Sequence, residues 1–232
     1  MRTHEKERKG FVNLLLVMLI LLVYVCVPVS FSTVSAMGYL YPQEPVLNGR
    51  DRYRVVAMEC VVSWDAVALE AILDCLAACE TRITFFITGD WARRNPALIR
   101  QMQAQGHEIG VIGYNSTKED DIRQMQSAME RTAAFLQEQT GTMPRLVFAG
   151  IHPEKDARNA AQAAGMRLVS CSVDLLCARG TKNDIVSRAV DAPFGGCIYL
   201  LEPTAAAVEA LPEIIAGLQR QGYVFATVGE IV

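Results

Sequence analysis

Four polar side chains of this sequence directly follow apolar runs, which is where enzymes built on parallel strands carry their chemistry. They are Asp65, His152, Asp174 and Glu202. If the fold brings them together, the carboxylates and the imidazole can pass protons as general acid and base. The same residue types also fix turns and helix starts, and we favour that role for Asp174 and His152. The other role open to His152 is a hydrogen bond to a sugar.

Two aromatic residues, Trp64 and Tyr114, follow two of the apolar runs. An exposed pair of rings can stack on a sugar, although rings buried beneath loops are the commoner case. Together with His152, Asp174 and Glu202, these two residues make up the predicted substrate groove.

The sequence holds only three histidines, His4, His107 and His152, which argues against a histidine-rich metal site. His107 stands just before a predicted strand, so we expect it to make a structural hydrogen bond rather than to bind a metal. Cys75 and Cys79 lie four residues apart on a predicted helix. Because no second such pair accompanies them, we assign them to packing.

Six of the seven cysteines lie beyond residue 36, namely Cys60, Cys75, Cys79, Cys171, Cys177 and Cys197. Outside the cytoplasm an even number of thiols permits disulfides, but the sequence does not give their pairing. Three of them, Cys60, Cys171 and Cys197, sit within apolar runs. A buried free thiol there would pack as a small hydrophobic side chain.

The composition is that of a globular protein with a slightly acidic balance. Hydrophobic residues make up 51% of the 232 residues, enough to bury a core and to exclude wholesale disorder. The formal net charge is −3, from 22 basic and 25 acidic side chains. That balance argues against nucleic acid as a partner bound through a basic surface.

Residues 1–36 have the layout of an export signal. Basic residues among the first ten precede a stretch, 11–36, without any charged side chain, and residues 14–29 are apolar throughout. That run approaches the ~20 residues that span a bilayer. Small residues at 34–36 suit a signal peptidase, so a cleaved signal peptide and an uncleaved membrane anchor are both open. Either one places the rest outside the cytoplasm, with residues 37–53 as a linker and 54–232 as the domain.

After the linker, short apolar runs alternate with longer amphipathic ones. Strands are expected over residues 54–60, 83–87, 108–112, 145–149, 167–172, 197–201 and 223–226. Helices are expected over residues 66–79, 96–105, 119–139, 154–164, 184–190 and 205–221. Repeated strand–helix units give parallel strands joined by right-handed crossovers. We therefore predict an α/β fold, a distorted (β/α) barrel of about seven parallel strands.

Motifs spread over nearly the whole predicted domain resemble the NodB-homology polysaccharide deacetylases, a family of carbohydrate esterases. The clearest are residues 84–89 (TFFITG), 106–110 (GHEIG) and 210–215 (ALPEII). Residues 172–174 (SVD) also fit. Ser63-Trp64 after the first strand resembles the sporulation-associated branch. The resemblance implies the (β/α) barrel of that family, with the site at the carboxyl ends of the strands.

The resemblance also implies a chemistry that can be checked residue by residue. Members hydrolyse N-acetyl groups with a divalent metal, usually zinc, held by one aspartate and two histidines, while a second aspartate is the base and a late histidine the acid. The metal positions fall at Val62, Ile112 and Ser116, the base at Val61 and the acid at Glu202. Valine and isoleucine have no lone pair for a metal, and serine is a poor zinc ligand. We therefore expect no metal cofactor and no reaction by the family mechanism.

These departures lead to three functional hypotheses. The favoured one is an exported, catalytically inactive deacetylase-like protein that binds cell-wall glycan or a protein partner in the envelope. The second is an active hydrolase of carbon–nitrogen bonds in polysaccharide, with a site rebuilt from Asp65, His152, Asp174 and Glu202. The third is a structural role, for instance in sporulation, which rests on family resemblance alone. The membrane is expected as a partner only of the N-terminal segment.

Overall fold

The computed structural model describes residue 18 and residues 44–50, 54–62, 67–113 and 122–232. The chain divides into two compact units, Met1–Pro42 and Gln43–Val232. The predicted export segment, apart from residue 18, and much of the predicted linker lie outside the described residues. Among the residues that are described, no helix is long and apolar enough to cross a membrane. The fold set out below is that of the second unit.

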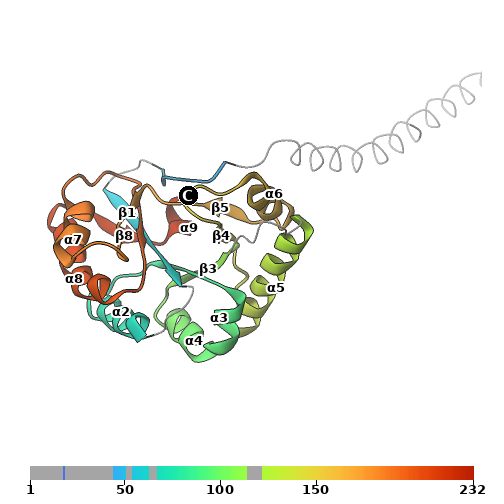
Figure 1. Cartoon of the computed structure of the whole chain (residues 1–232), viewed down its shortest axis with the longest axis horizontal. Helices are drawn as coiled ribbons and strands as arrows, with labels where there is room; N and C mark the ends of the chain where they lie inside the picture. The colour runs from blue at the N-terminus through green and yellow to red at the C-terminus, as the bar shows by residue number, and fades with distance from the viewer. Residues whose placement is uncertain (1–17, 19–43, 51–53, 63–66, 114–121) are drawn as a thin grey trace, which may run out of the picture. The chain divides into compact units, whose positions relative to one another are not determined.

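The second unit is an α/β fold whose paired strands all run parallel (Figure 1). The strands are β1 (Val55–Val62), β2 (Thr84–Ile87), β3 (Glu108–Ile112), β4 (Leu146–Phe148), β5 (Arg167–Val169), β6 (Val173–Asp174), β7 (Ile198–Leu201) and β8 (Val224–Ala226). They pair in the order β5-β4-β3-β2-β1-β7-β6, and β8 pairs with β1. This curled sheet confirms the predicted distorted (β/α) barrel.

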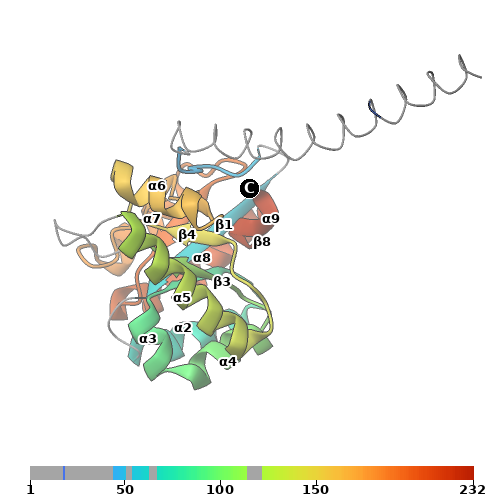
Figure 2. The ribbon, with the colours of Figure 1, turned by 90° about the vertical axis from the view of Figure 1, so that its right-hand side faces the viewer.

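Helices follow most of the strands, and all but the last, which packs on the inner face, lie outside the sheet (Figure 1). They are α2 (Val67–Ala78), α3 (Gly89–Arg94), α4 (Pro96–Ala104), α5 (Ile122–Thr140), α6 (Lys155–Ala163), α7 (Lys182–Val190), α8 (Ala205–Arg220) and α9 (Val228–Ile231). Local signals set their ends: Pro96 opens α4, and a capping box between Thr181 and Asp184 opens α7. In the view of Figure 2, α5 and α6 lie toward the viewer, where α5 packs on β3 and α6 on β5.

Apolar side chains form two groups on the two faces of the curled sheet. The larger group lies between the sheet and the helices. The smaller group fills the inside of the barrel and includes Ala57, Phe86, Phe148, Val169 and Leu200. Side chains alternate between the two faces along a strand. On β1, therefore, Glu59 points inward together with Ala57 and Val61.

Residues 44–50, called the strap, lie beside β5 and beside the start of β7. Val46 pairs with Val169 of β5, and Asn48 pairs with Cys197 just before β7. The hydroxyl of Ser172 lies 2.7 Å from the backbone oxygen of Leu47 and 2.7 Å from Asn48 Oδ1. The described part of the predicted linker is therefore hydrogen-bonded into the domain.

The structure corrects several element predictions. The sequence interpretation omitted α3, β6 and α9, and it extended the fifth strand to Ser172. That strand ends at Val169 because the backbone N–H of Ser170 donates to Val46 of the strap and that of Ser172 donates to Ile198 of β7. The backbone thus changes partners there. The predicted starts of helices 66–79 and 119–139 lie outside the described residues.

Candidate functional site

The carboxyl ends of the strands meet at one end of the barrel. This end of the barrel is called the mouth, and its described residues include Val61, Ile112, His152, Asp174 and Glu202. The other predicted groove, acid and metal positions lie outside the described part of the chain: Trp64, Asp65, Tyr114 and Ser116. The described part of the mouth therefore consists of residues at or just after the carboxyl ends of β1, β3, β4, β6 and β7.

The described metal positions are apolar and largely buried. Val62 is 0% exposed and packs in the core that faces the helices, while Ile112 packs against the group inside the barrel. Neither side chain has a lone pair to offer a metal ion. No three His, Cys, Asp or Glu side chains among the described residues come together as a metal site. The described residues thus do not fit the zinc ion that the resemblance implies.

Asp174 and Glu202 are brought together because β6 and β7 are neighbours in the sheet. Asp174 Oδ1 accepts a hydrogen bond from Leu176 N at 2.8 Å and fixes the turn after β6, which is the turn role expected for this residue. Cys177 then packs beside Glu202, whose backbone N–H is hydrogen-bonded to the thiol. Burial, and after it the charges of Glu202 and Asp174, raise the pKa of Cys177 to about 11. Two of the four predicted polar residues therefore share one side of the mouth.

Glu59 is a buried acid that the sequence interpretation did not single out. It is 0% exposed, and neither carboxyl oxygen has a hydrogen-bond partner. On β1 it stands in register with Thr84 of β2 and Leu200 of β7. Burial raises the pKa of Glu59 from 4.5 to about 8, because the apolar surroundings disfavour its charged form. The available signal was a single acid within the otherwise apolar run VVAMECVV.

The strand register places Glu59 and Asp174 on either side of Leu200 in β7, and both acids act on a second thiol, Cys171. Burial is the first cause that raises the pKa of Cys171 to about 12, and the charges of Glu59 and Asp174 follow. Burial is also the main cause that raises the pKa of Cys60, on the other face of β1. The charges of Cys177, Glu202 and Glu59 raise this pKa further. Asp174 and Glu202 therefore lie at the carboxyl ends of β6 and β7, whereas Glu59 lies in the middle of β1, inside the barrel.

His152 makes no hydrogen bond or ion pair with these acids. It is exposed in the turn after β4, and no hydrogen bond or ion pair joins it to another described residue. Glu154 is the N-cap residue of helix α6, and its side chain makes no capping hydrogen bond. The predicted capping role of His152 is therefore wrong, because the helix starts two residues later than a cap at His152 requires.

His107 has the structural role that the sequence predicted. Its Nδ1 accepts a hydrogen bond from Ile83 N at 3.2 Å, and its Nε2 lies 3.2 Å from Gln105 Oε1. Its ring meets Phe85 edge-on at 5.1 Å between centroids. Burial first, and then the charge of Arg82, lower the pKa of His107 to about 4. The ring is thus neutral near pH 7 and fully occupied by its neighbours.

The six cysteines of the domain are free thiols. Cys60, Cys171 and Cys197 are buried, as their apolar runs predicted. Cys75 on α2 and Cys79 in the turn just after it are half-buried and pack against the helix-facing core, in agreement with the packing assignment.

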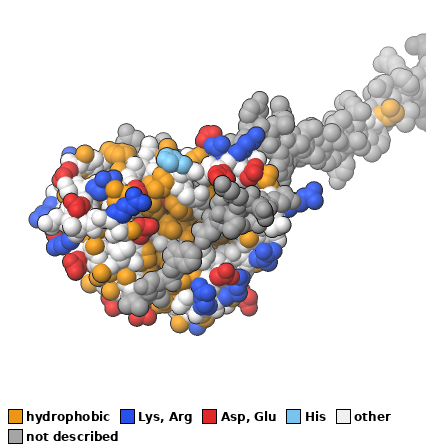
Figure 3. Space-filling view, viewed as in Figure 1, with side chains coloured by type: hydrophobic (Ala, Val, Ile, Leu, Met, Phe, Trp, Pro, Cys, Tyr) orange, Lys and Arg blue, Asp and Glu red, His pale blue; other side chains and the backbone are white. Residues whose placement is uncertain are grey.

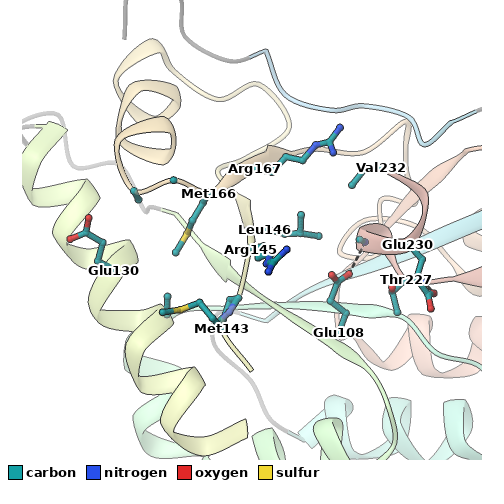
Figure 4. Close-up of a pocket in the computed structure, with 15 residues that line it drawn as sticks. Glu108, Glu130, Met143, Arg145, Leu146, Met166, Arg167, Thr227, Glu230 and Val232 are labelled. Atoms are coloured by element: carbon teal, nitrogen blue, oxygen red, sulfur yellow. Dashed lines mark hydrogen bonds between the residues drawn. The ribbon is translucent and has the colours of Figure 1, made fainter. Parts of the chain in front are cut away.

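A cavity of about 810 Å³ lies at the opposite end of the barrel, around the amino ends of β3, β4 and β5. Figure 4 shows Met143 and Met166 on one side of it and Glu108 with Glu230 on the other. Glu108 Oε2 accepts hydrogen bonds from Thr84 Oγ1 at 2.7 Å and Gly229 N at 2.8 Å, so this carboxylate is already engaged. None of the residues that border the mouth lines this cavity.

The arrangement of the mouth can be compared with known proteins. The family model for polysaccharide deacetylase matches residues 61–169, which include the ends of β1 and β3 and all of β4. Residues 61–169 therefore match the polysaccharide deacetylase family, the family that the motifs resemble. In this deacetylase-family domain, the described positions that the resemblance assigns to a metal and a base are Val61, Val62 and Ile112.

Curated relatives agree with this family assignment. The chain is 26% identical over 196 residues to the uncharacterized protein YlxY of Bacillus subtilis, covering 82% of this chain and 60% of YlxY. It is 24% identical over 166 residues to the peptidoglycan-N-acetylglucosamine deacetylase PgdA of Listeria monocytogenes, covering 69% of this chain and 35% of PgdA. The deacetylase-family chain thus spans less than two thirds of the length of either relative.

Solved structures share the fold. A wild-type protein of Bacillus anthracis, described as a CE4 family pseudoenzyme, superimposes with a TM-score of 0.75 at 22% identity. The match covers 82% of this chain and 69% of that one. A mutant of the same protein, described as having restored enzymatic activity, matches with the same TM-score. At this identity the likeness supports the deacetylase-family fold and no more.

Proposed function

We propose that this chain is an extracytoplasmic, non-catalytic member of its family that binds cell-wall glycan through the mouth. The observation that carries the proposal is the apolar replacement of the metal positions at Val62 and Ile112. Without a metal, nothing at these positions can polarise an amide carbonyl or lower the pKa of a water. The scaffold around them is intact, so the mouth is left as a surface for binding.

Charge and relatives support a glycan partner over a nucleic acid. On the face in view in Figure 3, Lys and Arg side chains are interspersed with Asp and Glu and form no single basic patch. The relative PgdA is a peptidoglycan deacetylase by name, which is the kind of polymer an emptied mouth of this family would still meet. A protein partner in the envelope is the alternative occupant.

The extracytoplasmic location rests on the N-terminal sequence and on these relatives. Residues 1–36 combine a basic start with a long uncharged stretch, the layout of an exported protein. Cleavage after residue 36 and retention as an anchor are both compatible with that layout. Mass spectrometry of the chain recovered from the producing cells distinguishes them by its N-terminal residue.

Metal content tests the loss of catalysis. The chain purified after growth with added zinc is expected to carry far less than one zinc per molecule by elemental analysis and to release no acetate from N-acetylated glycan. A matched variant with Ile112→His and Ser116→His regains two of the donors that the resemblance implies and is expected to bind more zinc than the unmodified chain. Circular dichroism confirms that this variant is folded. Stoichiometric zinc in the unmodified protein, together with acetate release, would overturn the proposal.

Co-sedimentation with purified peptidoglycan tests the binding function. The full chain is expected in the pellet, and Ile112→Arg, which places a long charged group at the mouth, is expected to remain in the supernatant. Met143→Arg adds the same charge at the opposite end of the barrel and is the control that still sediments. Equal sedimentation of both variants would show that the mouth is not the binding surface.

The pairing of Asp174 with Glu202 supports one second candidate, a hydrolase with a rebuilt site. Two carboxylates on one side of a cleft can act as acid and base when their pKa values differ. Acetate release that disappears in Glu202→Gln would favour this candidate. Absence of acetate release from the unmodified protein would exclude it.

A further inference from the structure

The mouth keeps acids while it has lost its metal positions. Glu59 comes from the inner face of β1, Asp174 from the end of β6 and Glu202 from the residue after β7. Leu200 of β7 is in register with Glu59 on one side and with Asp174 on the other. Asp174 and Glu202 therefore lie at the mouth, and Glu59 lies beneath them inside the barrel.

No ion pair joins Glu59, Asp174 or Glu202 to a described residue. Arg188 donates its Nε to the backbone oxygen of Asp174 at 2.9 Å, and Asp174 Oδ1 accepts from Leu176 N at 2.8 Å. The carboxylates of Asp174 and Glu202 therefore lack an ion-pair partner among the described residues and can take one from a ligand.

The buried state of Glu59 is an independent sign that a ligand belongs there. Both of its oxygens lack any partner, and its side chain is fully buried. An unpaired carboxyl group in an apolar interior costs several kcal/mol, and a native protein that keeps one has a reason such as an ion or a bound group. A polar ligand above the inner face of β1 would supply that reason.

The chemistry of the two glycan forms differs at one group. An N-acetylated sugar presents a neutral amide, which the family mechanism needs a metal to polarise. A de-N-acetylated amino sugar presents an ammonium group, which carboxylates bind through charge-assisted hydrogen bonds. Val61 and Ile112 add an apolar wall that suits the carbon face of either sugar. The polar groups of the mouth therefore favour the ammonium form.

We propose that the mouth selects glycan whose amino groups are free over N-acetylated glycan. In this proposal Asp174 and Glu202 contact the sugar ammonium, and Glu59 supplies the third carboxyl group from beneath. It rests on the proposed function, because it names the glycan class that the same mouth binds. The ligand is then the kind of polymer that an active member of the family produces.

Isothermal titration of the full chain with two matched oligosaccharides tests the selection. The probes are the hexamers of glucosamine and of N-acetylglucosamine, at 0.15 M salt to screen non-specific charge effects. The glucosamine hexamer is expected to bind at least about tenfold more tightly. Glu202→Gln and Asp174→Asn are each expected to remove most of that preference while leaving the affinity for the N-acetylated hexamer unchanged.

Two controls separate the specific site from bulk charge. Glu130→Gln removes the same charge at the exposed surface of α5, beside the opposite cavity, and is expected to keep the preference. Hexalysine carries a similar charge without sugar rings and is expected not to compete. Equal affinity for both hexamers, or loss of the preference in Glu130→Gln, would overturn the selection and leave the proposed function standing. Failure of both hexamers and of peptidoglycan to bind would instead remove the proposed function.

Discussion

The residue that most distinguishes this domain is the acid inside its barrel. A fully buried glutamate without a hydrogen-bond partner is less stable than an apolar side chain of similar size, because folding removes its water without replacing it. Its carboxyl oxygens have no hydrogen-bond partner among the described residues, so nothing there offsets that loss. The protonated form is therefore the stable one in the folded state, as its raised pKa indicates.

This acid predicts how stability depends on pH. The unfolded chain releases the Glu59 proton above about pH 4.5, whereas the folded protein keeps it until about pH 8. Between those values the folded state binds more protons, so the contribution of Glu59 to the free energy of unfolding falls as pH rises, by at most roughly 1.4 kcal/mol per pH unit. Urea unfolding at pH 5 to 9 should show wild type losing stability relative to Glu59→Gln, which cannot ionise. Parallel curves for the two proteins would contradict a neutral buried Glu59.

At the residue scale, the sequence predicted part of the mouth but not Glu59, which lies inside the barrel. Asp174 and Glu202 were predictable because they directly follow apolar runs, and parallel strands deliver such residues to one end. Glu59 was not, because an acid within a strand shows whether it faces water or the interior only once the partner strands are known. The role predicted for His152 depended on where a helix begins, a boundary that local sequence sets loosely.

At the element scale, the main alternation of strands and helices was predictable and the short elements were not. The strand 108–112 was predicted with its observed bounds because GHEIG and the following residues are β-rich and bounded by glycines. The two residues of β6 carry too little pattern to be read, and they form a strand only because β7 offers a free edge. Helices α3 and α9 are six and four residues long, too short for a helical repeat of apolar residues to show.

The packing of β2 against β3 predicts a sharp sensitivity at one glycine. A Cβ atom at Gly110 would lie 2.4 Å from Phe86 Cε1, inside a barrel that the rings of Phe86 and Phe148 fill. Gly110→Ala is therefore expected to lower the free energy of unfolding by about 1 to 3 kcal/mol, the usual cost of overpacking. Gly180→Ala is the control, since its Cβ would meet its neighbours at an ordinary 3.4 Å. Equal urea midpoints for both variants would show that the barrel interior adapts.

At the scale of the whole molecule, the strap connects β5, the start of β7 and the last helix of the domain. The strand path ends at β5 on one side and β6 on the other, and the strap pairs beside β5 and β7. Arg50 N also donates to the oxygen of Ile231 in α9 at 2.8 Å, so the strap contacts the last helix. The residues that connect the N-terminal segment to the domain are thus part of its hydrogen-bonded structure.

This arrangement predicts that the fold needs the strap. Residues 43–232, the whole second unit, are expected to unfold cooperatively in urea, because that unit contains its own core. Starting the chain at residue 51 removes the backbone hydrogen bonds of Val46 with Leu168 and Ser170 and that of Gly49 with Gly196. It also uncovers the barrel interior beside Val169. The free energy of unfolding is expected to fall by about 2 kcal/mol or more, at roughly 1 kcal/mol per lost hydrogen bond. Identical urea midpoints for the two chains would show that the barrel is equally stable without the strap.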